Sequence, residues 1–229
     1  MKKYDPHEAL ISLHVPKCAG QSFMQILRTW FEKNFYPHYF QLQGKPPPRY
    51  PLRPGICIHG HFNRAKGIGV SDYYPGANQF ITVLRDPLEM ALSNYFFWKT
   101  KARERQIKTG KIGKGDKADY KDIDDFFRKR PRSHLWKFMP WDLTPDNFKE
   151  VLESRFVWIG AAECLQGAAD LLADLLGFEK IEVGRINPSQ RDEELSPETR
   201  ESFIAGNRLE FAVYNHVRRI LEEQGVLSV

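Results

Sequence analysis

The 229-residue chain has few cysteines and no long apolar run, and these two features exclude several classes of protein. Its three cysteines, Cys18, Cys57 and Cys164, are scattered and odd in number, so they suggest neither a disulfide framework nor a zinc site. No apolar stretch approaches the roughly 18 to 20 residues needed to cross a membrane. The first residues include lysines but no apolar segment behind them, so we expect no signal peptide. These absences together predict a cytoplasmic protein.

Positive charge is concentrated in one part of the chain. The net charge is +5, but residues 99–132 alone hold 13 basic and 6 acidic side chains. A local excess of this kind either attracts a polyanion or forms a solvated surface, and both interpretations stay open. The part of this stretch that is rich in glycine and lysine, about residues 104–120, is expected to be a mobile insertion.

Short apolar strands alternate with amphipathic helices along the sequence. Strands are expected over residues 10–15, 56–59, 79–84 and 156–160. Helices are expected over about 23–31, 88–102, 122–130, 144–154 and 165–176, from 197 onward, and through the last apolar stripe up to Gly225. The Pro-rich and aromatic-rich segment after the first helix is expected to be a loop. The pattern predicts one α/β domain over residues 1–229 with a mainly parallel central sheet flanked by helices.

Residues 16–22, with the sequence PKCAGQS, connect the first strand to the first helix. The free N–H groups at such a helix start point at whatever lies beyond the strand's carboxyl end. Gly20 allows close backbone approach to an anion, Lys17 adds a charge and Ser22 adds a hydroxyl donor. The segment predicts a phosphate or sulfate site, with an ordinary strand–helix turn as the alternative. It is not the GxxxxGK[ST] loop of many nucleotide-binding proteins, because its lysine precedes the glycine.

A second candidate anion contact follows the strand at 79–84. Arg85 ends that strand, and Ser93 lies about two turns into the next helix, so the pair could hold another phosphate. The alternative for Arg85 is a salt bridge to a helix carboxylate. Asp86 and Pro87 suit the N-cap and first turn of that helix.

PKxxGxS after the first strand and Arg-Asp-Pro-x5-Ser-x-Tyr after a later one resemble the two cofactor loops of sulfotransferases that use 3′-phosphoadenosine 5′-phosphosulfate (PAPS). The Gly60-His61-Phe62 strand end, residues 156–160 with Glu163 after them, and the Asn-x-Ser loop at 187–189 also look like that family. The resemblance is closest to carbohydrate sulfotransferases, including heparan sulfate 2-O and 6-O enzymes and shorter bacterial relatives. It covers roughly residues 10–221 and implies a P-loop-like α/β fold with PAPS as co-substrate and no metal.

The resemblance also implies a role for each residue at a matching position. The 5′-phosphosulfate would be bound by Lys17, Gly20, Gln21 and Ser22, with the backbone of Cys18 and Ala19. The 3′-phosphate would be bound by Arg85 and Ser93.

An acceptor hydroxyl needs a base near neutral pH, and histidine titrates there. His61 matches the Gly-His position of the family and is the expected base. His59, two residues earlier and expected on the same face of the strand, is the alternative candidate or an acceptor-side residue. Lys17 would stabilise charge on the leaving phosphate oxygen. His14 is expected to be a core histidine, and His59 with His61 lack a third ligand for a metal site.

The leading hypothesis is a PAPS-dependent sulfotransferase that transfers a sulfuryl group in line to a hydroxyl, which the resemblance places on a carbohydrate. Three alternatives stay open. One is a sulfotransferase for a small-molecule or lipid acceptor, with residues 35–50 lining an apolar pocket. Another is a nucleotide-dependent kinase, which would require Mg²⁺ and ATP. The third is a non-catalytic module that binds polyanions. No nucleic acid partner is expected.

Overall fold

The computed structural model of the chain describes residues 1–109, 120–184 and 191–227. The chain divides into two compact units. The sheet unit comprises Met1–Arg85, His134–Ile186 and Ala212–Val229, and the helical unit comprises Asp86–Ser133 and Asn187–Phe211. Neither unit is one continuous stretch of sequence. The single domain expected over residues 1–229 stays a prediction, and most of the expected insertion at 104–120 lies outside the described residues.

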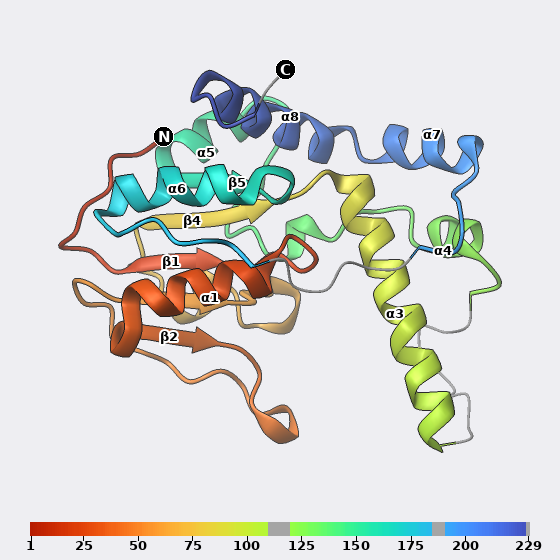
Figure 1. The fold of residues 1–229 in the computed structure, drawn as a ribbon, viewed down its shortest axis with the longest axis horizontal. Helices are drawn as coiled ribbons and strands as arrows, with labels where there is room; N and C mark the ends of the chain where they lie inside the picture. Colours follow the sequence, from red (N-terminus) through yellow and green to blue (C-terminus); the bar gives the residue numbers. More distant parts are fainter. Residues whose placement is uncertain (110–119, 185–190, 228–229) are drawn as a thin grey trace. The chain divides into compact units, whose positions relative to one another are not determined.

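The sheet unit is built on five parallel strands in the order β2-β3-β1-β4-β5 (Figure 1). The strands are β1 (Leu10–Leu13), β2 (Phe35–His38), β3 (Cys57–Gly60), β4 (Gln79–Leu84) and β5 (Phe156–Ala161). Every residue of β1, β3, β4 and β5 is buried, as expected for parallel strands covered on both faces. Figure 1 shows α1 and α6 in front of the strands. The predicted α/β class with a parallel central sheet flanked by helices is confirmed.

Strand β2 forms where the sequence predicts only a loop, so that prediction is wrong for Phe35–His38. β2 pairs with β3 alone and is therefore an edge strand. Pro37 has no N–H to donate, but an edge strand needs hydrogen bonds on one side only, so a proline is tolerated there. The prolines at 46–48 lie outside regular structure, as predicted.

The helices of the sheet unit follow the apolar periodicity of the sequence. They are α1 (Gly20–Phe31), α2 (Val70–Tyr73), α5 (Phe148–Arg155) and α6 (Leu165–Leu176), and α8 (Arg208–Glu223) ends in this unit. The apolar face predicted for α1 is buried. α6 has the predicted bounds and ends at Gly177, whose φ of 75° is left-handed. α5 begins later than the predicted residue 144, because Thr144 and Asn147 first close a hydrogen-bonded turn.

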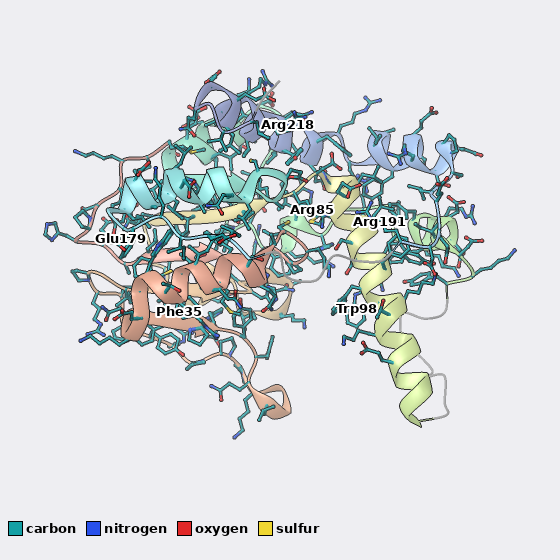
Figure 2. The ribbon with its side chains drawn as sticks, viewed as in Figure 1. Phe35, Arg85, Trp98, Glu179, Arg191 and Arg218 are labelled. Atoms are coloured by element: carbon teal, nitrogen blue, oxygen red, sulfur yellow. The ribbon has the colours of Figure 1, made fainter. Side chains whose placement is uncertain are left out.

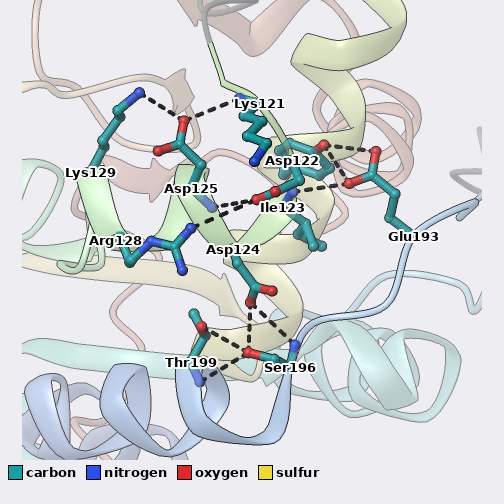
Figure 3. A network of polar contacts seen from close by, with 11 residues as sticks. Lys121, Asp122, Ile123, Asp124, Asp125, Arg128, Lys129, Glu193, Ser196 and Thr199 are labelled. Carbon is teal, nitrogen blue, oxygen red and sulfur yellow. Dashed lines mark hydrogen bonds and ion pairs between the residues drawn. The ribbon is translucent and has the colours of Figure 1, made fainter.

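The helical unit packs α3 (Pro87–Thr109), α4 (Ile123–Lys129) and α7 (Pro197–Gly206) around an aromatic core. The predicted cap of α3 is confirmed, because Asp86 Oδ1 accepts from the N–H groups of Leu88 and Glu89 at 2.9 and 3.0 Å. α3 extends well beyond the predicted end at 102. A polar network joins the helices, in which Glu193 accepts from Tyr95 Oη and the Ile123 N–H, both at 2.9 Å (Figure 3).

Gly60, the last residue of β3, leaves no room for a side chain. A Cβ at this position would lie 2.0 Å from the backbone oxygen of His38 on β2. The backbone cannot move away without separating the two strands, so we expect Gly60→Ala to lower the free energy of unfolding by about 3 kcal/mol. Urea unfolding measures the effect. Gly76→Ala is the matched control, because its Cβ would meet only the tip of Leu52 at 3.8 Å. Equal stabilities for the two variants would contradict this packing.

Candidate functional site

The candidate site lies at the carboxyl edge of the sheet unit, around the end of β1. The chain places β3 and β2 on one side of β1, and β4 and β5 on the other. In open α/β sheets, the crevice beside such a change of direction is where ligands bind. The segment 16–22 comes shortly after β1, His61 follows β3, and Arg85 follows β4. This edge therefore brings together three of the predicted site elements.

The backbone of the segment 16–22, here called the anion loop, is held in an unusual conformation. Lys17 and Ala19 have φ values of 70° and 54°, in the left-handed region that non-glycine residues seldom adopt. Such turns form concave groups of N–H donors that bind anions, and their strain is concentrated at functional sites. The loop therefore has the backbone geometry of an anion site as well as the sequence of one.

Helix α1 starts at Gly20 without a side-chain cap and without an acidic residue in its first turn. First-turn N–H groups have no partner within their own helix. Within the described residues, no acceptor is recorded for those of Gly20, Gln21 and Ser22. These donors and the positive end of the helix dipole favour an anion at this point.

Two cationic side chains lie at the anion loop: Lys17 belongs to it, and Arg85 contacts it. Arg85, labelled in Figure 2, donates from Nη1 to the backbone oxygen of Lys17 at 3.2 Å. Its Nε lies 4.0 Å from a carboxylate oxygen of Glu163, in the 3-10 turn Ala162–Cys164. The salt bridge named as the alternative for Arg85 therefore forms, and the same side chain also holds the loop through its hydrogen bond to Lys17. Burial, together with the Arg85 charge, lowers the pKa of Lys17. An incoming anion would relieve this repulsion between the two cations.

The other predicted contributions to the cofactor site are only partly described. Ser93 lies buried on α3 of the helical unit, whereas Arg85 belongs to the sheet unit, so the 3′-phosphate pair stays a prediction. The Asn-x-Ser segment at 187–189 lies outside the described residues. Ser22 is buried and donates from Oγ to the backbone oxygen of Gly184 at 2.9 Å. Its predicted contact with an anion therefore requires release of that proton from Gly184.

Gly20 has a packing role that the sequence does not reveal. A Cβ at Gly20 would lie 1.7 Å from Nε2 of His14, so the imidazole occupies the space that any larger residue would need. Cys18 is buried in the same loop, and burial raises the pKa of its thiol, which outweighs the opposing effect of the Arg85 and Lys17 charges. Cys18 is thus suited to contribute backbone and not a thiolate.

Three histidines gather beside the loop. The ring of His14, just after β1, lies 5.2 Å from the ring of His59 and 4.3 Å from that of His61, measured between centroids. The expectation that His59 and His61 face the same side is confirmed by their contact with one ring. Burial lowers the pKa of all three, to about 2 for His14 and about 3 for His59. The cluster is therefore neutral near pH 7.

The hydrogen bond of His61 determines which nitrogen carries its proton. Nδ1 lies 2.8 Å from the backbone oxygen of His14. Because a carbonyl oxygen can only accept, Nδ1 is the protonated nitrogen and Nε2 retains a lone pair. The ring is partly exposed and is flanked by Tyr39 and Phe138, with centroids 5.0 and 5.7 Å away. His61 therefore has the tautomer and the exposure that a general base requires.

His59 lies deeper in the unit. It has no exposed surface, its Nδ1 lies 2.8 Å from Ser12 Oγ, and its Nε2 has no hydrogen-bond partner within the described structure. Burial favours His61 over His59 for proton transfer, and a role for His59 stays a prediction. Tyr39, which contacts His14 and His61, had no motif to reveal it beyond its place in an aromatic-rich segment.

No family model and no curated protein matches this chain. Among solved structures, the chain is similar to mouse sulfotransferase SULT7A1 complexed with PAP, with a TM-score of 0.48 and 10% identity over 98% of this chain and 91% of that chain. A likeness at this level assigns no function here. Within the described residues, no group of three or more His, Cys, Asp or Glu side chains could hold a metal ion, and no helix is long and apolar enough to span a membrane.

Proposed function

We propose that this protein is a PAPS-dependent sulfotransferase that transfers a sulfuryl group to an acceptor hydroxyl. The observation that carries the proposal is that an anion-binding loop and a candidate base lie at the same carboxyl edge of the sheet. A cationic loop follows β1 and leads into α1, whose first-turn N–H groups have no acceptor among the described residues, and a histidine with an available Nε2 lone pair follows β3. Anion binding beside a neutral base is the combination that sulfuryl transfer to a hydroxyl needs.

In this mechanism the anion loop holds the 5′-phosphosulfate, and His61 Nε2 accepts the proton of the acceptor hydroxyl. The hydroxyl oxygen then bonds to sulfur as the bond from sulfur to the phosphate oxygen breaks. Lys17 and the first N–H groups of α1 stabilise the negative charge that develops on the departing phosphate. The proton ends on His61, the sulfuryl group on the acceptor, and 3′,5′-adenosine bisphosphate leaves.

A carbohydrate is the proposed acceptor, supported by the resemblance of the two loops and the Gly-His strand end. The basic stretch at 99–132 offers less support than its composition suggests. Lys99 contacts Asp192 at 2.7 Å and Glu193 at 2.6 Å, and Lys129 contacts Asp125 at 2.7 Å. These pairs neutralise part of the charge that a polyanion would otherwise meet.

Thermal unfolding with 3′,5′-adenosine bisphosphate tests the proposal. At about 100 times its dissociation constant a ligand adds roughly 2.7 kcal/mol, so the melting temperature should rise by more than about 5 °C for a chain of this size. We expect Lys17→Ala and Arg85→Ala to abolish the rise. Lys33→Ala, an exposed lysine beyond the end of α1, is the matched control and should retain it. A rise only with ATP and Mg²⁺ would favour a kinase, and none with either would leave polyanion binding.

A further inference from the structure

The His14 ring lies between the base and the anion loop, yet the mechanism above assigns it nothing. On one side its centroid is 4.3 Å from that of His61. On the other its Nε2 occupies the space where Gly20 lacks a Cβ. The side chain is 7% exposed, so it is more than nine-tenths buried. Within the described chain, this Nε2 has no hydrogen-bond partner, and it is not among the fully buried polar atoms, so a ligand can reach it.

Tyr39 determines where the proton of His14 resides. Tyr39 Oη lies 2.6 Å from His14 Nδ1, and the described structure gives this hydroxyl no other acceptor. Burial raises the pKa of Tyr39 and lowers the pKa of His14 to about 2, so both groups are neutral. Within the described residues the phenol proton has an acceptor only if Nδ1 is unprotonated, and that tautomer carries the imidazole proton on Nε2.

We propose that His14 is a neutral hydrogen-bond donor to the sulfuryl group of bound PAPS, with Tyr39 as the residue that positions it. The inference rests on the proposed function. During transfer the sulfuryl group lies between the anion loop and the hydroxyl activated by His61, and His14 lies between those same two elements. A donor at this point would hold the sulfuryl oxygens in line for attack without adding a further positive charge.

Binding measurements isolate the sulfuryl contact because 3′,5′-adenosine bisphosphate lacks that group. His14→Phe keeps the shape of a flat ring and removes the donor. We expect it to weaken PAPS binding about tenfold, as for loss of a hydrogen bond to a charged group, and to change bisphosphate binding by less than about twofold. His14→Gln, whose amide reaches a similar position, should restore most of the PAPS affinity. Equal losses for both ligands, or no loss for PAPS, would overturn the inference.

The tautomer can be observed without any ligand. In protein labelled with ¹⁵N-histidine, long-range ¹H–¹⁵N spectra distinguish the protonated nitrogen, and His14→Phe assigns the signals. We expect the proton on Nε2 in the wild type and a shift of population towards Nδ1 in Tyr39→Phe. A wild-type proton on Nδ1 would overturn the role of His14. Failure of the wild type to bind either nucleotide would instead overturn the proposed function, so the two failures are distinguishable.

Discussion

His61→Ala is expected to lower the rate of sulfuryl transfer by about 10²-fold or more, the usual contribution of a general base. Its affinity for 3′,5′-adenosine bisphosphate should stay nearly unchanged, because the proposed role of His61 is towards the acceptor and the proposed contacts with the bisphosphate are made by other residues. Transfer from radiolabelled PAPS to a panel of carbohydrate hydroxyl acceptors measures the rate, and calorimetry measures binding. His7→Ala, at an exposed histidine remote in sequence from the motifs, is the control.

The pH profile separates a base from a structural histidine. A base acts in its neutral form, so kcat/KM falls as pH drops through the pKa of His61 in the free enzyme. Burial, opposed only in part by the hydrogen bond to His14, lowers that pKa below its ordinary value. The plateau of activity should therefore extend below about pH 6.5, and His61→Ala should lack this limb. A variant that retains the full rate would exclude His61 as the base, and parallel loss of rate and binding would indicate a structural role.

Local features of the sequence predicted well the strands, helices and caps that surround the site. The strand at 79–84, the Asp86 cap and the helix at 165–176 depend on residues close together in the chain, and the structure confirms each of them. The anion loop was found in the same way, because a strand, a short glycine-containing turn and an amphipathic helix follow one another directly. Where neighbours in sequence determine the conformation, the pattern was sufficient.

The contacts that complete the site join residues far apart in sequence. Tyr39 reaches His14 from a segment in which β2 was not predicted, because Pro37 obscured the strand pattern. The need for glycine at position 20 depends on where the His14 ring points, which no motif reports. Ser22 was expected to contact an anion, but its proton is engaged by Gly184, 162 residues away. Such pairings depend on tertiary packing and on long loops, and a local sequence pattern predicts neither.

Acid should destabilise the sheet unit strongly, because its histidines are buried in their neutral forms. The pKa is lowered to about 2 for His14, about 3 for His59 and about 4 for His38. In the unfolded chain each returns to about 6.5. Below that pH the unfolded state takes up protons that the folded state does not. The stability present above about pH 6.5 is therefore lost as the pH falls towards the pKa values of the folded state.

Each such histidine contributes about 1.4 kcal/mol in total between about pH 7.5 and pH 5.5, because it is protonated in the unfolded chain over part of that range only. Between about pH 7.5 and pH 5.5 the three should together remove about 4 kcal/mol of stability, and His61 adds to the loss in the same direction. Urea unfolding at both pH values measures the difference. His59→Phe should reduce that difference by about 1.4 kcal/mol even if the variant is less stable at both, because one proton fewer is taken up on unfolding. An unchanged difference would mean that His59 takes up its proton as readily in the folded protein as in the unfolded chain, which would contradict its burial in the neutral form.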